Sequence, residues 1–338
     1  MQPLPSPIHL RQLKNQSKDL RDACRAGQTD ALARLYQHHP QHSPQATRTL
    51  SLQDVQLVIA REQGYDSWPR LVAAAEQAHK PTSPFDDFVG VSVVADETRR
   101  LLASASVSSK PVLLIGEPGT GKRTCARLLH EAGSRSSHLL QQLTCSGNET
   151  LVESNLFGHE VDAFTGARAS LDGLLQTGDG GSLLLDDVEQ LGAEAQIKMQ
   201  SYLDLGRFRR LGAAAELSSD VRVIAATSSA TLESLQRVLR EDLFYQLTVL
   251  VVELPPLRDR PEDIEPLVQH FATQAIDEVA PRIERPKFLP AAMTALREHP
   301  WPGNVRQLRN TVERAVITSD GTSIGADQLQ LSAVVDLV

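Results

Sequence analysis

The stretch PVLLIGEPGTGKRTCARLLHEAG, residues 111–133, decides the fold of this chain. An apolar run, a glycine-rich turn and a helical segment follow one another directly, as in a strand, phosphate loop and helix unit. The glycines let backbone N–H groups point toward a phosphate, the helix directs its positive end to the same place, and Lys122 reaches the β and γ phosphate oxygens. We therefore predict a nucleotide phosphate site, the P-loop, formed by Gly116, Glu117, Pro118, Gly119, Thr120, Gly121, Lys122, Arg123 and Thr124.

The P-loop departs from the strict pattern at one position. That pattern has Ser or Thr directly after the lysine, as a magnesium ligand, whereas this chain has Arg123. Thr124 lies one residue further on, roughly 100° around the helix, so it cannot simply take over as the ligand.

Three more apolar runs extend this unit into a sheet: SLLLD (182–186), VRVIAA (221–226) and TVLVVEL (248–254). They are rich in branched residues and separated by helical stretches, which is typical of a parallel sheet covered by helices on both faces. The first of them ends in Asp186, and Asp187 follows. Such sheets hold magnesium and polarise an attacking water with acidic residues at this edge, so we expect Mg²⁺ at these two carboxylates.

The sequence predicts two domains flanking a linker, and the second of them has two parts. Residues 1–80 read as helices without a catalytic constellation, and LVIAREQGYDSWPRL (57–71) resembles a short helical segment that often precedes ankyrin repeats in bacterial proteins, which suggests a protein-binding or regulatory domain. Residues 81–87 have the Pro, Ser and Thr content of a linker. Residues 88–258 form the predicted α/β nucleotide-binding domain, and residues 259–338 form a predicted helical lid.

Composition excludes several classes of protein. A chain of 338 residues with 41% hydrophobic residues can bury real cores, and a net charge of −8 without a basic block does not favour direct binding to nucleic acid. Its three cysteines are too few and too scattered for a disulfide framework or a zinc ribbon. Because we find neither a signal peptide nor a run of about 18 apolar residues, we expect a cytoplasmic protein without a membrane span.

One further stretch carries a family resemblance. ESNLFGHEVDAFTGA (153–167) resembles the hallmark loop of the bacterial enhancer-binding proteins, the sigma-54-dependent activators of the AAA+ class. Eight more segments match the family in order between about residues 85 and 332: FVGVS (88–92), GEPGTGK (116–122), GGSLLLDD (180–187), GRFRRLG (206–212), VRVIAAT (221–227), REDLFYQL (240–247), LPPLRDRPEDI (254–264) and WPGNVRQLRN (301–310).

The resemblance implies an AAA+ P-loop NTPase that binds ATP and Mg²⁺ and works as a hexameric ring. It implies that Val89 and Gly90 border the adenine and that Asp186 orders the magnesium. Asp187 stands at the position of the catalytic glutamate. By the same resemblance, Arg240 is a finger that reaches the neighbouring subunit's ATP, Arg306 is a second sensor in the lid, and the loop tip that contacts the sigma-54 RNA polymerase holoenzyme is Phe164, Thr165 and Gly166.

Four positions depart from the family on the hydrolytic side. Asp187 is one methylene shorter than the usual Glu, Thr144 stands where Asn holds that glutamate, Ser228 replaces the Asn of the first sensor, and Gln246 replaces a second arginine. A displacement of about 1 Å at a catalytic group costs on the order of a hundredfold in rate, and arginine fingers contribute ~10³–10⁵. These changes suggest a site that keeps nucleotide and turns it over slowly.

Two other departures lie outside the hydrolytic site. Asp162 replaces a glycine of the hallmark loop, and because Asp tolerates some of the same turn conformations we expect a modest effect. Only 26 residues follow Val312, too few and too acidic for the helix-turn-helix that the family usually appends, so we expect no direct DNA binding.

The sequence leaves three functions open. The first is ATP-dependent remodelling of sigma-54 RNA polymerase without a DNA-binding domain of its own. The second is a nucleotide-binding regulatory module, with weak or no hydrolysis, that modulates related rings or another partner. The third is a ring that remodels some other protein. Residues 1–80 would supply the contact with an unknown protein or signal.

Overall fold

The structure is a computed structural model that describes residues 10–39, 50–72, 84–229, 231–279, 286–319 and 323–331. The chain separates into two compact units, residues 1–83 and residues 84–338. Each is described by itself.

The first unit is helical. Its helices are α1 (Leu10–Arg25), α2 (Thr29–His38) and α3 (Leu52–Glu62), and residues 68–72 are helical as well. Ser51 begins α3 with a capping box, because its side chain accepts a hydrogen bond from the Asp54 N–H while the Asp54 carboxylate accepts one from the Ser51 N–H. The core of this unit is a cluster of buried side chains that includes Leu20, Leu35, Val55, Ile59 and Leu71.

The second unit is built on a five-stranded parallel sheet with the order β2-β5-β8-β1-β9. The strands are β1 (Val112–Ile115), β2 (Leu140–Thr144), β5 (Ser182–Asp186), β8 (Arg222–Thr227) and β9 (Leu250–Glu253). Every residue of β1, β5 and β8 is buried, as expected of strands covered on both faces. The parallel α/β sheet predicted from the apolar runs is confirmed, and β2 is a further strand that those runs did not reveal.

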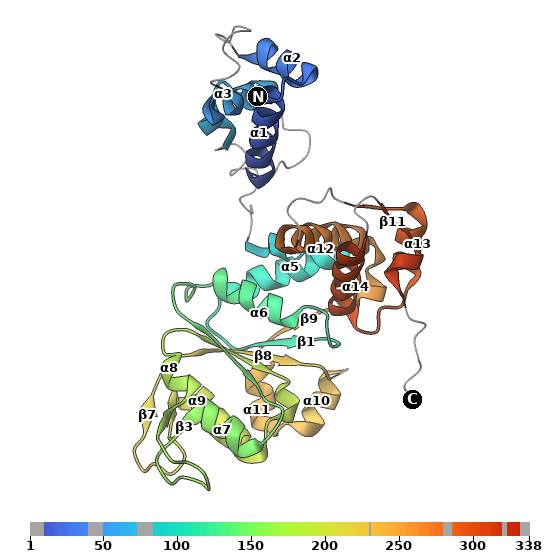
Figure 1. Cartoon of the computed structure of the whole chain (residues 1–338). Coiled ribbons are helices and arrows are strands. Elements are labelled where there is room, and N and C mark those ends of the chain that lie inside the picture. The colour runs from blue at the N-terminus through green and yellow to red at the C-terminus, as the bar shows by residue number, and fades with distance from the viewer. Residues whose placement is uncertain are drawn as a thin grey trace. The chain divides into compact units, whose positions relative to one another are not determined.

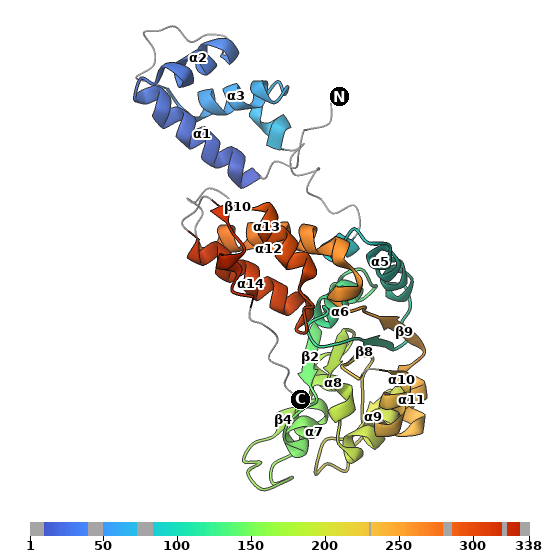
Figure 2. The ribbon, with the colours of Figure 1, turned by 90° about the vertical axis from the view of Figure 1, so that its right-hand side faces the viewer.

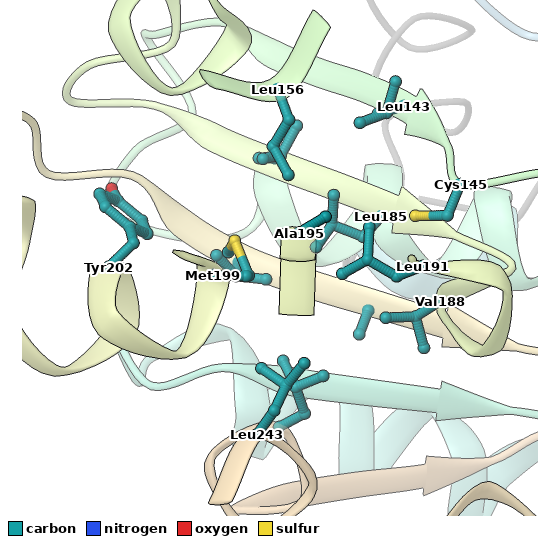
Figure 3. Close-up of a cluster of buried hydrophobic side chains, with 14 of the residues drawn as sticks. Leu143, Cys145, Leu156, Leu185, Val188, Leu191, Ala195, Met199, Tyr202 and Leu243 are labelled. Atoms are coloured by element: carbon teal, nitrogen blue, oxygen red, sulfur yellow. The ribbon is translucent and has the colours of Figure 1, made fainter. Parts of the chain in front are cut away.

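Helices cover both faces of this sheet (Figure 1). On one face lie α5 (Val93–Ser106) and α6 (Lys122–Glu131); on the other lie α7 (Glu149–Phe157), α8 (Leu174–Thr177), α9 (Ala193–Leu205), α10 (Leu232–Val238) and α11 (Glu241–Leu247). Successive side chains of β1 serve different cores, since Leu113 belongs to the cluster of α7, α9 and α11 and Leu114 to that of α5 and α6. In Figure 3, Leu143 and Leu185 from the sheet meet Leu156, Met199 and other helical side chains in the first of these clusters.

Two short antiparallel hairpins interrupt the α/β pattern. One pairs β3 (Gly158–His159) with β4 (Leu171–Asp172), and the other pairs β6 (Arg207–Phe208) with β7 (Leu217–Ser218). The Glu160 N–H donates to the Leu211 carbonyl at 3.0 Å and the Leu211 N–H donates to the Gly158 carbonyl at 2.9 Å, so the two hairpins are joined. They extend from the end of the unit away from the lid helices (Figures 1 and 2).

The lid consists of α12 (Ile264–Val279), α13 (Pro290–Glu298) and α14 (Asn304–Thr318), with a small pair of parallel strands, β10 (Lys287–Phe288) and β11 (Ser323–Ile324). Figure 2 shows these helices packed together beside α6. Their core surrounds Trp301, which is fully buried and donates its indole N–H to the Leu296 carbonyl at 2.8 Å. The helical lid predicted from the sequence is therefore present.

All three cysteines lie within the described residues. Cys24, Cys125 and Cys145 are buried and free. Burial raises the pKa of the Cys125 and Cys145 thiols to about 12, so both stay protonated. Within the described residues, no helix has the length and apolar character needed to cross a membrane.

Candidate functional site

The predicted P-loop joins the end of β1 to the start of α6 and is held closed by its own lysine. The Lys122 Nζ donates to the Gly116 carbonyl at 2.6 Å, to the Glu117 carbonyl at 3.1 Å and to the Ser228 hydroxyl at 3.1 Å. Burial lowers the pKa of Lys122, and the nearby carboxylates oppose that shift. A phosphate that enters this loop would replace the two carbonyls as the partner of the lysine.

The P-loop also packs against the lid. Gly119 has φ +82°, and any side chain there would place its Cβ 2.3 Å from the Gly303 carbonyl oxygen, so both its conformation and its contact require glycine. The Asn304 Nδ2 donates to the Pro118 carbonyl and to Glu117, each at 3.1 Å. Arg258 makes two hydrogen bonds to the Glu117 carboxylate, at 2.8 and 2.6 Å, and this lowers the pKa of that carboxylate.

A cavity of about 290 Å³ lies between the P-loop and the lid. It is lined by residues of four segments, among them Val89, Thr120, Thr124, His270 and Val305. Its walls combine apolar side chains with polar and charged ones, so the cavity can hold a ring that also offers hydrogen-bonding groups. The prediction placed the adenine against Val89 and Gly90; Val89 lines this cavity, and a Cβ at Gly90 would meet Asp263 Oδ2 at 2.8 Å.

Three carboxylates gather at the carboxyl edge of the sheet, where β5 ends. Asp186 is the last residue of β5, and Asp187 follows with φ +54°. Burial raises the pKa of Asp187, and the charges of Asp186 and Glu189 raise it further, while Lys122 and Arg123 lower it. A carboxylate with a raised pKa beside the P-loop lysine fits the role of a general base.

Glu189 is a site residue that our sequence interpretation missed. Its Oε1 accepts a hydrogen bond from the Ser228 N–H at 3.1 Å, and its Oε2 is buried without a partner among the described residues. Ser228 in turn accepts from Lys122, so Glu189, Ser228 and Lys122 form one connected chain. The third acidic residue in DDVE was the available signal, but nothing in the sequence showed that its side chain turns back to β8.

The structure ties Asp186 to the P-loop through Arg123. The Arg123 Nε donates to Asp186 Oδ2 at 2.6 Å, and its Nη2 lies 3.5 Å from the Thr144 hydroxyl. Thr144 pairs with Asp186 across the two neighbouring strands, so the two residues lie at the same edge of the sheet.

A magnesium ion does not fit the residues as they stand. One oxygen of Asp186 is bound to a guanidinium, the residue after Lys122 has no oxygen in its side chain, and Thr124 lines the cavity beside the lid. Among the described residues, no group of three or more His, Cys, Asp or Glu side chains has an arrangement that could hold a metal ion.

Three further positions were expected to act on the phosphates or across a subunit boundary: Arg306, Arg240 and Gln246. Each has a different environment in the structure. The backbone of Arg306 lies at the P-loop, because its backbone N–H donates to the Gly119 carbonyl at 3.2 Å. The charge of its side chain lowers the pKa of Lys122. Arg240 precedes α11, is exposed, and its guanidinium has no hydrogen bond or ion pair with any described residue. Gln246 is partly buried and donates its Nε2 to Asp204 of α9 in the same chain.

The predicted sigma-54 contact lies at the tip of the β3–β4 hairpin. Thr165 and Gly166 are exposed, and Phe164 is half-buried with its ring 5.1 Å from that of His159 in an edge-to-face contact. Asp162 adopts φ +61°, as expected of an aspartate that stands in for glycine. Its N–H donates to the Ala167 carbonyl at 2.8 Å, which closes the tip into a compact turn.

Comparison with known proteins agrees with this arrangement. Residues 88–253 match the sigma-54 interaction domain, and residues 258–334 match the AAA+ ATPase lid domain. The chain is 38% identical over 250 residues to the DNA-binding transcriptional regulator NtrC of Rhizobium meliloti (strain 1021), covering 72% of this chain and 51% of NtrC. It is 36% identical over 273 residues to the Nif-specific regulatory protein of Rhodobacter capsulatus, covering 80% of this chain and 47% of that protein.

Among solved structures, NtrX from Brucella abortus in complex with ADP has a TM-score of 0.66 and 29% identity, covering 82% of this chain and 63% of NtrX. The chain spans about half the length of the two curated relatives. Its sigma-54 interaction domain and its lid, together with the P-loop on a parallel sheet, establish that the chain belongs to the sigma-54-dependent transcriptional activators of the AAA+ class.

Proposed function

We propose that this chain binds ATP and uses its hydrolysis to remodel a sigma-54 RNA polymerase holoenzyme, which activates transcription. The observation that carries the proposal is the β3–β4 hairpin, which presents Thr165 and Gly166 to solvent and packs the half-buried Phe164 ring against His159. A hairpin tip with two exposed residues and a half-buried phenylalanine suits a contact that is made and broken in each cycle. NtrX from Brucella abortus has been crystallised with ADP and with ATP, which supports nucleotide binding in a relative of this fold.

In the proposed reaction, the P-loop amides and Lys122 bind the β and γ phosphates. Asp187 accepts a proton from the attacking water, because it is the carboxylate with the raised pKa at this edge. Glu189 positions the Ser228 backbone, and Ser228 positions Lys122. Arg306 adds positive charge from the lid side of the P-loop.

Magnesium, which the sequence predicted at Asp186 and Asp187, enters no step of this proposal. The bond between Arg123 and Asp186 opposes a metal ligand set at that position.

The proposed working form is a homo-oligomeric ring, a hexamer by analogy with the family. The exposed and unpaired Arg240 supports it, since a guanidinium without a partner among the described residues is available to the ATP of a neighbouring subunit. In this proposal, the first unit binds a protein partner or senses a signal. We propose that the chain acts in the cytoplasm.

A second function is favoured by Gln246. Where the family has an arginine, this chain has an amide that is bound to Asp204 within its own subunit. One less arginine at the subunit boundary, with the shorter Asp187, fits a regulatory module that retains nucleotide and modulates the rings of a relative.

Capture of the sigma-54 holoenzyme tests the first function. The full chain, charged with ADP and aluminium fluoride as a transition-state analogue, is expected to retain the holoenzyme, and Phe164→Ala is expected to lose it. Val107→Ala is the matched control, because Val107 is an exposed apolar side chain at the end of α5. Absence of capture by the parent chain, or equal capture by Phe164→Ala, would contradict the remodelling function.

A further inference from the structure

The side chain that follows the P-loop lysine occupies the position where a cation is expected. Arg123 is the second residue of α6, and its Nε lies 2.6 Å from Asp186 Oδ2 at the end of β5. Its guanidinium also approaches the hydroxyl of Thr144 on the neighbouring strand. In P-loop proteins the residue after the lysine and the acidic residue at this strand end are the two that hold the divalent ion.

The chemistry of these two residues opposes a metal ion and favours an internal cation. A guanidinium has five N–H donors and no acceptor, so it cannot be a ligand, and its charge is permanent. Asp186 is a buried carboxylate, and a buried charge requires a partner. Arg123 supplies that partner, and a divalent ion would have to displace it.

The Arg123 guanidinium can still donate hydrogen bonds to a phosphate. The side chain of Arg123 is 58% exposed although that of Asp186 is only 13% exposed, so one edge of the guanidinium faces the carboxylate and the remainder faces solvent beside the P-loop. Arginine binds phosphate oxygens with two parallel hydrogen bonds. Lys122 and Arg306 already lie close enough for their charges to interact, so Arg123 adds a third positive charge at this site.

We propose that the Arg123 guanidinium takes the place of the divalent cation, so that this chain binds nucleoside di- and triphosphates with little dependence on magnesium. The proposal rests on the nucleotide site of the proposed function and concerns how that site neutralises phosphate charge. The proposal also agrees with the position of Thr124, which lines the cavity and therefore does not lie at the cation position.

Binding of a fluorescent ADP analogue to the full chain, with magnesium and with EDTA, tests the proposal. The parent chain is expected to show a Kd in EDTA within about threefold of its Kd in magnesium, because the charge that the metal would supply is already present. Arg123→Ser restores the hydroxyl and removes the cation, and its Kd in EDTA is expected to be at least about tenfold weaker than in magnesium. Arg123→Lys keeps the charge but cannot make the bidentate contact, so its Kd in EDTA is expected to lie between those of the parent and Arg123→Ser.

Manganese gives a second readout that is independent of turnover. Water-proton relaxation is expected to show Mn²⁺ held by Arg123→Ser, where Asp186 is released, and not by the parent chain. Arg100→Ser is the control, because it removes an exposed arginine of α5 and with it the same charge.

The outcomes separate the two proposals. Nucleotide binding by the parent only in the presence of magnesium, with Mn²⁺ held as in Arg123→Ser, would overturn the role of Arg123 and leave the nucleotide site standing. Failure to bind nucleotide under either condition would overturn the nucleotide site and this inference with it.

Discussion

Glu189 and Ser228 are joined by a hydrogen bond of 3.1 Å from the Ser228 backbone N–H to Glu189 Oε1. The bond connects the end of β8 to the turn after β5, and through the Ser228 hydroxyl it reaches Lys122. A carboxylate that the family resemblance did not indicate therefore belongs to the phosphate site of this chain.

The first prediction separates a positioning role from a catalytic one. Glu189→Ala removes the acceptor for Ser228 and is expected to lower ATP turnover on the order of a hundredfold, because the P-loop lysine loses its support. Glu189→Gln retains an acceptor oxygen and is expected to keep turnover close to the parent. Asp187→Asn is expected to lower ATP turnover on the order of 10²–10⁴-fold, because it removes the general base. A loss in Glu189→Gln as deep as that in Asp187→Asn would identify Glu189 as the base instead.

The second prediction concerns the pH dependence of turnover. Burial and the neighbouring charges of Asp186 and Glu189 raise the pKa of Asp187, so its basic form is lost at a higher pH than that of an ordinary aspartate. The acidic limb of the pH–rate profile is therefore expected at a higher pH than an ordinary aspartate would give. Glu189→Gln removes one repelling charge, which stabilises ionised Asp187, and so shifts that limb to lower pH. An unchanged limb would show that a different group titrates.

The third prediction addresses the missing arginine. Gln246→Arg alone is expected to raise turnover little, because the new guanidinium would pair with Asp204 of its own subunit. The double variant Gln246→Arg with Asp204→Asn frees that guanidinium and is expected to raise turnover by about tenfold or more. Asp204→Asn alone serves as the control. An equal rise in the single and double variants would show that Asp204 does not restrain the position.

The fourth prediction concerns stability at the boundary between the nucleotide domain and the lid. Asp263 is fully buried; it accepts from the Val91 and Ser92 N–H groups at 2.6 and 2.7 Å, and lies 3.8 Å from Arg260. Asp263→Ala is expected to cost about 3–5 kcal/mol in the free energy of unfolding, because it leaves a buried guanidinium without its carboxylate.

Urea unfolding of the full chain measures that cost. Asp259→Ala removes an exposed aspartate nearby and is expected to change the free energy of unfolding by less than about 0.5 kcal/mol. Equal values for the two variants would contradict the structural role of Asp263.

Local sequence was enough to predict the sheet and the P-loop. The strands β1, β5 and β8 are continuous apolar runs, and a strand of this kind can be read directly from its residues. β2 has Gln141 and Gln142 at its centre, and Leu143 is its one buried residue, so its hydrophobic signal was too weak to find.

Contacts between distant segments could not be predicted in the same way. Arg123 was noticed as a departure from the P-loop pattern, but its bond to Asp186 joins residues 63 positions apart and depends on how α6 lies on β5. Asp263 binds backbone N–H groups more than 170 positions away. Side-chain direction decides such contacts, and the spacing of residues within one segment carries no information on it.

The most direct test of the central claim is steady-state ATP hydrolysis by the full chain over a series of protein concentrations, with Lys122→Ala as the control. The account predicts turnover per chain that rises cooperatively with concentration, because the active site is completed by a neighbouring subunit, and that is abolished in Lys122→Ala. Tight ATP binding with no turnover above the control at any concentration would contradict the remodelling ATPase.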